Sequence, residues 1–324
     1  MTFAPKGSSV HEDTEYFRAS TTLQKDIFRT LLYFDIFDHP LNAAEIHAFL
    51  PSNSTTVGEI TAACASMPLS FLISHRDGLF FVSRNSGDLL RERLRKERRA
   101  QWYWLIARIM GTIIRMFPFV RGVFISGELS KGVMTHRGDI DFFVVTANGR
   151  LWVTRTLLIL FKKLFLLNSK KFFCLNHFVT ENYLDVTERN LFTAMEIATL
   201  KPIDNSEFLR TYVSHNLWIK DYLPNLGDRE VFPESSHRSN FLQEFLEFPL
   251  KGKIGDRLDE YLLSFWKGIW RKRYAHFPAE KRNELFRTEP FLSTAYGGDF
   301  LTRILEEYNR RLSVHGLDLR PSND

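Results

Sequence analysis

The sequence predicts an α+β protein, and three patterns support this class. Up to residue 118 the apolar residues recur mostly at helical spacing, interrupted by two short apolar runs that suit a hairpin. Between residues 119 and 187, short runs of β-forming residues alternate with one helical pattern, which is typical of a mixed sheet with helices. Beyond Val186 each identifiable pattern is helical. With 324 residues, of which 44% are hydrophobic, the chain has room for more than one core.

The N-terminal part is expected to form three helices and a hairpin. The first helix ends at the turn Asp38-His39-Pro40, and an Arg76-Asp77-Gly78 turn joins the two apolar runs of the hairpin. This order resembles a winged helix-turn-helix domain. The expected elements are a helix over Thr22 to Phe37, helices capped by Asn42 with Glu45 and by Thr56 with Glu59, and strands over Phe71 to Ile73 and Leu79 to Val82.

The third helix, Val57 to Met67, stands where a winged helix-turn-helix domain presents its recognition helix. It contains no lysine or arginine and carries Glu59. Base and phosphate contacts depend heavily on cations. The sequence therefore argues against sequence-specific DNA binding and favours a docking or packing module.

A long helix is predicted from Asp88 to Met116, with an apolar stripe along it. Its first third, RERLRKERR, holds six cations against two glutamates. Such a density suits contact with a nucleic-acid backbone or an acidic partner. The alternative is a solvated helix face in which Glu92 pairs with Lys96 one turn later. The six cations are Arg91, Arg93, Arg95, Lys96, Arg98 and Arg99.

The segment VFISGELSKGVMTHRGDIDFFVVT, from Val123 to Thr146, carries the chemistry. A strand ends at Gly127, a loop of small residues follows, and the chain returns into a strand that opens with Asp-Ile-Asp. Because side chains alternate along a strand, Asp139 and Asp141 are expected on one face and Ile140 in the core. Mg²⁺ prefers oxygen ligands and often takes one or two protein carboxylates plus substrate phosphates. The pair therefore predicts a magnesium site, and the simpler alternative is a cap at the start of a strand.

This segment resembles the polymerase-β nucleotidyltransferase superfamily over about Phe119 to Val186. The pattern of that superfamily is a Gly-Ser that ends a strand, a short spacer, and then Asp-x-Asp. The resemblance implies a loop that holds nucleotide phosphates, two aspartates that bind one or two Mg²⁺ ions, and a third carboxylate on a later strand that helps to activate the attacking hydroxyl. An N-terminal winged helix and a C-terminal helical region also resemble the arrangement of some uncharacterised bacterial members.

Transferred to this chain, the resemblance assigns nucleotide binding to Ser126, Gly127, Glu128, Ser130 and Lys131. Gly127 matches the glycine that lets backbone N–H groups approach phosphate. Glu128 stands where the superfamily has serine, and a carboxylate there repels a triphosphate unless it binds metal or turns outward. Ser130 and Lys131 follow closely enough to compensate, with Lys131 as a phosphate-binding cation.

The resemblance is incomplete at the third carboxylate. The strand that should carry it has the sequence FFCLNHFVTEN, with Asn176 at the expected position. Asparagine offers a carbonyl oxygen but accepts no proton. Either Glu181 reaches the site from the end of the strand and completes the catalytic set with Asp139 and Asp141, or the base is missing. Further candidates for substrate contacts are His136, Arg137 and His177.

The function expected from these residues is Mg²⁺-dependent transfer of a nucleoside monophosphate from a nucleoside triphosphate to an acceptor hydroxyl, with loss of pyrophosphate. The sequence does not identify the acceptor, and the resemblance implies a protein, an RNA end or a small molecule. Two alternatives remain. One is a degenerate member of the superfamily that binds nucleotide or metal without turnover. The other is a nucleic-acid-binding regulator that uses the N-terminal domain and the arginine-rich helix.

Composition favours a cytoplasmic protein. Cys64 and Cys174 lie in apolar stretches, which indicates buried reduced thiols. The N-terminus lacks the apolar core of a secretion signal, and charges interrupt the apolar stretch Leu151 to Leu167, so neither export nor a membrane span is expected. The net charge of +5 fits a phosphate-bearing partner without requiring one. The expected divisions are a mobile tail over 1–20, a winged helix-turn-helix-like domain over 21–86, a connecting helix over 87–118, a nucleotidyltransferase-like core over 119–187 and a helical C-terminal region over 188–324.

Overall fold

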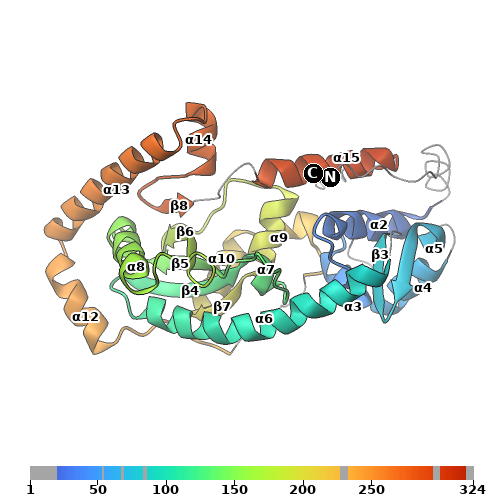
Figure 1. Ribbon diagram of the computed structural model, residues 1–324, viewed down its shortest axis with the longest axis horizontal. Helices are drawn as coiled ribbons and strands as arrows, with labels where there is room; N and C mark the ends of the chain where they lie inside the picture. The colour runs from blue at the N-terminus through green and yellow to red at the C-terminus, as the bar shows by residue number, and fades with distance from the viewer. Residues whose placement is uncertain are drawn as a thin grey trace.

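The computed structural model describes residues 20–52, 55–66, 69–82, 86–226, 233–294 and 300–318. Within them the chain forms a three-stranded sheet and a five-stranded sheet with helices around both, which confirms the α+β class (Figure 1). The tail expected over 1–20 lies outside the described residues, apart from Ser20. None of the described helices has the length and apolarity needed to cross a bilayer.

The N-terminal unit combines helices with a small antiparallel sheet of strand order β1-β3-β2. The two expected capping boxes are present: Asn42 and Thr56 each accept a hydrogen bond from the backbone of the glutamate three residues later. A third box, Thr21 with Gln24, starts the first helix. The elements are α2 Thr22–Asp35, β1 Leu41–Asn42, α3 Ala43–Phe49, α4 Val57–Ala65, α5 Leu69–Leu72, β2 Ile73–Arg76 and β3 Leu79–Val82.

The hairpin is present, but its first strand begins later than the sequence predicts. Asp77 and Gly78 both have positive φ angles, 52° and 77°, as a two-residue turn of type I′ requires. This turn pairs Arg76 with Leu79 and thereby sets the register of the whole hairpin. Strand β2 therefore starts at Ile73, and the residues before it form α5.

Helix α6, Ser86–Arg115, leaves the N-terminal unit and runs along one side of the larger sheet (Figure 1). Two cations of its basic run are buried against the turn between α2 and β1. Arg93 donates to the carbonyl oxygen of Pro40 at 3.0 Å and pairs with Glu45 at 2.7 Å. Lys96 donates to two carbonyl oxygens of the same turn, at 3.1 and 3.2 Å. These cations therefore hold the helix to the N-terminal unit.

A third cation of the run, Arg99, donates to the backbone oxygen of Met134 at 2.8 Å, in the loop before the Asp-Ile-Asp sequence. The N–H of Met134 in turn donates to the backbone oxygen of Lys96 at 3.0 Å. The basic run is thus neither a continuous solvated face nor a continuous track for phosphates. Its exposed cations are Arg91, Arg95 and Arg98.

The larger sheet has five strands in the order β7-β4-β5-β6-β8 (Figure 1). Strands β5 and β6 are parallel, and the other neighbouring pairs are antiparallel. The expectation that everything beyond Val186 is helical is wrong, because β7 and β8 come from that region and form the two edges. Both are short, and β7 contains Pro202, which an edge strand tolerates. The strands are β4 Val120–Ser126, β5 Asp141–Thr146, β6 Cys174–Thr180, β7 Lys201–Asp204 and β8 Leu292–Thr294.

Helices bury this sheet on both faces. Phe143 and Val145 of β5 belong to a core that includes α9, α10 and the N-terminal unit. Phe142 and Val144 point to the opposite face and belong to a second core with α6, α8 and α13. This alternation is expected of a strand covered on both sides. The helices are α8 Leu151–Phe165, α9 Leu191–Thr199, α10 Ser206–His215, α11 Ile219–Tyr222, α12 Phe241–Glu247, η1 Phe248–Leu250, α13 Lys253–Arg273, α14 Ala279–Leu285 and α15 Phe300–Val314.

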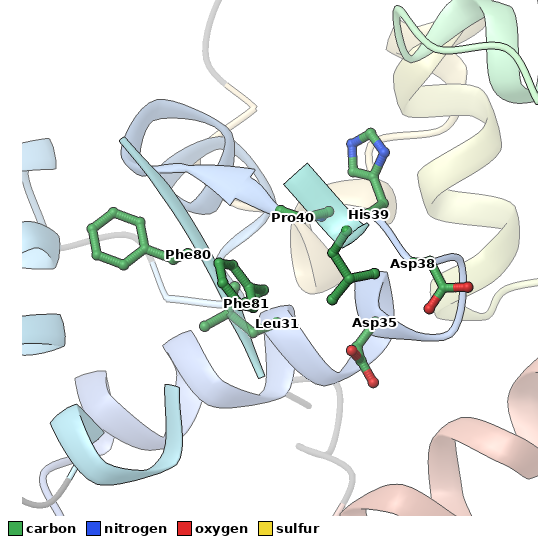
Figure 2. A pocket seen from close by; sticks show the side chains of 8 residues that line it. Leu31, Asp35, Asp38, His39, Pro40, Phe80 and Phe81 are labelled. Carbon is green, nitrogen blue, oxygen red and sulfur yellow. The ribbon is translucent and has the colours of Figure 1, made fainter. Parts of the chain in front are cut away.

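The C-terminal helix α15 lies against α2, so the last described helix joins the N-terminal unit (Figure 1). The Tyr308 hydroxyl donates to the backbone oxygen of Arg29 at 3.3 Å, and Arg311 pairs with Asp35. Asp35 also lines a small hollow beside α2, together with Asp38 and apolar side chains of β3 (Figure 2). Because Arg311 pairs with the Asp35 carboxylate, this carboxylate is part of the contact between α2 and α15.

Helix α8 is capped by a residue from a distant helix. Within the described chain Arg150, which precedes α8, makes no side-chain cap, so the first N–H groups of the helix need another acceptor. Asp259 of α13 accepts hydrogen bonds from the N–H groups of Trp152 and Val153, both at 2.9 Å. Burial raises the pKa of Asp259 to about 6, while these two hydrogen bonds act in the opposite direction.

The interface between α8 and α13 also buries a cation. The guanidinium of Arg155 lies 4.9 Å from the ring centroid of Phe178, 5.8 Å from that of Trp266 and 5.1 Å from that of Trp270. Burial lowers the pKa of Arg155 to about 9, so the side chain is charged at neutral pH and is attracted by the ring faces. Helix α13 therefore holds α8 through both a cap and an aromatic cage.

We expect Asp259→Ala to lower the free energy of unfolding by about 2 kcal/mol, because it leaves two buried N–H groups without an acceptor. Asp259→Asn keeps an acceptor oxygen and removes a buried charge, so it should cost clearly less. Asp256→Ala is the control, since the Asp256 side chain is 57% exposed and its pair with Arg150 is worth less than about 1 kcal/mol. Thermal unfolding followed by circular dichroism measures all three variants. Equal losses for alanine and asparagine at position 259 would contradict the capping role.

Candidate functional site

The candidate site lies at one end of the larger sheet, where β4 stops and β5 starts. Ser126, the last residue of β4, is paired with Asp141, the first residue of β5. Gly127 follows with a φ of 68°, a left-handed conformation that favours glycine, and it opens the short helix α7, Gly127–Ser130, with which the loop from β4 to β5 begins. A Cβ atom at this position would lie 2.5 Å from Oδ2 of Asp141, which is closer than real Cβ contacts. The glycine therefore allows the backbone of the loop and the Asp141 carboxylate to meet.

The residues just before β5 continue its alternation. Ile140 is buried in the core, its N–H donates to the backbone oxygen of Lys171 at 2.9 Å, and its carbonyl accepts from the N–H of Cys174 at 3.0 Å. Asp139 and Asp141, on either side of it, are both partly exposed. The two carboxylates singled out by the sequence are therefore found at the end of the sheet, in the polar surroundings of the loop.

Asn176 stands at the position expected for the third carboxylate. Its amide group donates to Oδ1 of Asp141 at 2.7 Å, and its own oxygen accepts from the Cys174 thiol at 3.1 Å. Oδ1 of Asp141 accepts from the amide nitrogen, which sets the orientation of the Asn176 amide. Burial raises the pKa of Cys174 to about 12, so its thiol is protonated and able to donate. Both cysteines are free and buried, as expected from the sequence.

Negative charge accumulates around Asp141. Burial is the main cause that raises the pKa of this carboxyl to about 7, and a hydrogen bond with Cys174 acts in the opposite direction. The neighbouring carboxylates of Glu196, Asp139 and Glu128 raise the pKa further. Carboxylates that repel one another in this way favour a bound cation or a shared proton.

Glu128, at the position of the superfamily serine, holds the segment that leads to Asp139. Its carboxylate accepts hydrogen bonds from the N–H of Thr135 at 2.7 Å and from the hydroxyl of the same residue at 3.2 Å. A Cβ atom on Gly138 would lie 2.7 Å from Oε2 of Glu128, so the loop closes tightly around this side chain. Glu128 therefore has a local structural role, although its charge still acts on Asp141.

Glu196, on α9, is a site carboxylate that the sequence did not reveal. It accepts hydrogen bonds from Nζ of Lys131 at 2.7 Å and from the N–H of Gly127 at 3.4 Å. Helix α9 covers the face of the sheet toward which Phe143 points, and Asp141 shares that face by alternation. A signal was present, because Glu196 is the single charged residue in the stretch LFTAMEIATL. A lone charge on an otherwise apolar helix needs a polar partner.

Glu181 is not brought to the site. Its N–H donates to the backbone oxygen of Thr146 at 2.8 Å, and Thr146 ends the strand that Asp141 begins. At about 3.3 Å per residue, this six-residue strand separates the two ends by roughly 17 Å. Because β5 and β6 are parallel, the end of β6 lies beside the end of β5 and far from its start. The catalytic role expected for Glu181 therefore has no geometric basis.

The other residues expected to bind nucleotide lie in the loop but are engaged with it. Ser130 is buried, and its hydroxyl donates to the backbone oxygen of Gly127 at 2.8 Å. The Ser126 hydroxyl donates to the backbone oxygen of Asp141 at 3.5 Å, a long contact. Lys131 is paired with Glu196, as described above. The Gly127 N–H and the Lys131 ammonium are thus both engaged with an anionic side chain, that of Glu196.

The histidines and the arginine near the site differ in exposure. His177 is stacked on Phe143, with 4.4 Å between ring centroids, and burial lowers its pKa to about 3. It is therefore a neutral core residue at physiological pH. His136 and Arg137 are exposed on the loop before Asp139, where a substrate has access to them.

Within the described residues, no set of three or more His, Cys, Asp or Glu side chains is arranged as a metal site. No family model, curated protein or solved structure matches the chain. The resemblance to the nucleotidyltransferase superfamily consequently rests on the sequence of residues 119–187.

We expect Asp141→Asn to stabilise the metal-free protein increasingly as the pH rises. The pKa of Asp141 is about 7 in the folded protein, against 3.8 for an ordinary aspartate. Between these values the folded protein keeps a proton that the unfolded chain has lost, so the wild type loses stability as the pH rises through this range. Asparagine has no proton to lose. The variant should therefore gain about 2 kcal/mol relative to the wild type between about pH 5 and pH 8.

Urea unfolding in EDTA at both pH values measures this difference. Asp77→Asn is the matched control, because Asp77 lies in the exposed hairpin turn and asparagine suits the same left-handed conformation. A difference between Asp141→Asn and the wild type that stays constant with pH would contradict the raised pKa of the Asp141 carboxyl.

Proposed function

We propose that the protein is a nucleotidyltransferase of the polymerase-β type, which transfers a nucleoside monophosphate from a nucleoside triphosphate to an acceptor hydroxyl in the presence of Mg²⁺. The observation that supports this proposal is the junction of Gly127 with Asp141. A left-handed glycine that directly follows one strand lies against a carboxylate that opens the next, and Asp139 precedes that carboxylate by two residues. Phosphate needs backbone N–H groups and Mg²⁺ needs carboxylate oxygens, so the junction suits both.

The donor chemistry fits Mg²⁺. Asp139 and Asp141 offer hard oxygen ligands, and Mg²⁺ commonly takes one or two carboxylates and fills its remaining positions with water and substrate phosphates. Burial is the main cause of the raised pKa of Asp141, and the nearby carboxylates of Glu196, Asp139 and Glu128 add to it; a bound cation would offset their charge. Asn176 directs its amide hydrogens to Asp141, so its oxygen is not available there as a further ligand. We therefore expect one ion, held by the two aspartates.

In the proposed reaction, the acceptor oxygen forms a bond to the α-phosphorus of the triphosphate. The bond from that phosphorus to the bridging oxygen breaks, and pyrophosphate leaves with the electron pair. Bound Mg²⁺ would supply neutralisation of the phosphate charge. The N–H of Gly127 and the ammonium of Lys131 would hold the outer phosphates. The proton of the acceptor hydroxyl passes to water, because Asn176 stands where the resemblance expects a base and accepts no proton.

Mg²⁺ and a nucleoside triphosphate together should raise the melting temperature of the wild type, because both bind only the folded protein. At a ligand concentration of about 100 times Kd, the gain corresponds to about 2.7 kcal/mol. Asp139→Asn should abolish the joint effect, because it removes one negative charge from the ion's ligands, and should leave the metal-free fold intact. Thermal unfolding with each of the four triphosphates measures binding, and release of pyrophosphate measures turnover.

Asp77→Asn removes the same charge from the distant hairpin turn and should respond to ligands like the wild type. The proposal is refuted if neither Mg²⁺ nor any of the four triphosphates moves the melting temperature, and if Asp139→Asn behaves like the wild type. The chain would then share at most a fold with the superfamily.

A second candidate is a protein of the same type that binds nucleotide without turnover. Asn176 favours this candidate, because it stands in place of a base, and so does the pairing of Lys131 with Glu196. Such a protein would be stabilised jointly by Mg²⁺ and triphosphate and would release no pyrophosphate. The two measurements above therefore separate the two candidates.

We further propose that the N-terminal unit is a winged-helix domain that serves as a docking module. Its order of elements, with helices α2, α3, α4 and the short α5 before the hairpin, and its strand order β1-β3-β2 support this architecture. The exposed side of α4 carries Glu59 and offers no lysine or arginine. A helix of this composition has no cation with which to approach DNA phosphates.

The full-length protein should bind duplex DNA weakly, with the same affinity for any sequence and a steep dependence on salt. Arg91→Ala combined with Arg95→Ala should weaken this residual binding, because these side chains are 71% and 67% exposed. Fluorescence anisotropy with random duplexes and with duplexes enriched by selection provides the measurement. Tight binding of a selected duplex that survives moderate salt would show that the N-terminal unit reads DNA.

A further inference from the structure

Two donors that a phosphate would need are already occupied. The N–H of Gly127 and Nζ of Lys131 both donate to the carboxylate of Glu196, at 3.4 and 2.7 Å. Lys131 also donates to the backbone oxygen of Gly127 at 3.2 Å, which keeps its ammonium group beside the loop. One carboxylate therefore bridges a backbone N–H and a cation of the same loop, as the oxygens of a phosphate group do in an anion site.

The position of Glu196 is determined by the packing of α9. Its neighbours Met195 and Ile197 are buried in the core, whereas the side chains of Glu196 and Lys131 are 27% and 18% exposed. The helix also begins at a side-chain cap, in which Asn190 accepts from the backbone of the third residue after it. The carboxylate is thus presented to the loop by a well-anchored helix, and solvent still reaches it.

We propose that Glu196 is a built-in anion that occupies the position of a substrate phosphate, and that a polyphosphate binds by displacing it from Gly127 and Lys131. This inference rests on the proposed nucleotide-binding function. The ligand class is a diphosphate or triphosphate chain, because one end must take over the donors of the loop while the other extends toward Asp139 and Asp141. Displacement keeps the ammonium of Lys131 paired, since it exchanges one anionic partner for another.

The test compares the wild type with Glu196→Gln, which keeps the shape of the side chain and removes its charge. Dissociation constants for inorganic triphosphate and for ATP, each with Mg²⁺, are measured by calorimetry. We expect about tenfold tighter binding of both ligands to the variant, because the ligand no longer competes with an anion. Glu207→Gln is the control, since Glu207 is an exposed glutamate on α10, and it should leave both constants unchanged.

Lys131→Met distinguishes displacement from a general change in charge. Alone it should weaken triphosphate binding, and in the double variant with Glu196→Gln most of the tenfold gain should disappear, because both residues act on the same phosphate. Thermal unfolding without ligand establishes that each variant is folded. If Glu196→Gln does not fold, Glu196→Asp takes its place, because aspartate retracts the carboxylate while retaining its charge. This variant should also bind triphosphate more tightly than the wild type.

The outcomes are distinguishable. If the wild type binds triphosphate and Glu196→Gln binds it equally well, the inference is overturned and the proposed function stands. Weaker binding by Glu196→Gln also overturns the inference, because Glu196 would then act as a ligand of the metal. If neither the wild type nor any variant binds inorganic triphosphate or ATP, the inference and the proposed function fail together.

Discussion

The pairing of Ser126 with Asp141 is the constraint on which the candidate site depends. It brings the end of β4 and the start of β5 together, so the loop between them must leave and return at the same edge of the sheet. Gly127 makes the exit possible, because its positive φ and missing Cβ admit the Asp141 carboxylate. The loop is then closed by the hydrogen bonds that Glu128 accepts from Thr135. One strand pairing thus places the left-handed turn at Gly127 beside the Asp141 carboxylate.

The closed loop brings several carboxylates close together, and their repulsion destabilises the ligand-free fold. Burial and, after it, the carboxylates around Asp141 raise the pKa of this residue, and the hydrogen bond from Asn176 reaches only one of its oxygens. Lys131 offsets the charge of Glu196 on the loop side. Binding sites commonly retain such arrangements, because the charges that weaken the empty fold are those that recognise the ligand. The imbalance lies at Asp141, on the side where a divalent cation is expected.

Helix α6 connects this site to the rest of the molecule. Arg93 and Lys96 are buried against the N-terminal unit, while Arg99 holds the loop before the aspartates through the backbone of Met134. The density of these cations suggests contact with nucleic acid, but the three residues form hydrogen bonds within the protein instead. A buried cation with several hydrogen-bond acceptors is costly to disrupt, so these contacts fix how the N-terminal unit and the loop are placed along helix α6.

From the sequence alone, short-range patterns determined most of the helices, the capping boxes, the hairpin turn and the aspartate pair, because each depends on residues close together in the chain. Only the tertiary structure decided which carboxylates lie around Asp141. Parallel pairing of β5 with β6 carries Glu181 to the far end of the sheet, and the packing of α9 brings Glu196 to the loop. Likewise, β7 and β8 are too short to show a period of their own, and they become strands because β4 and β6 offer edges to pair with. Long-range pairing depends on which distant strand lies beside each sheet edge and on which surface each helix packs. No local pattern of residues contains that information.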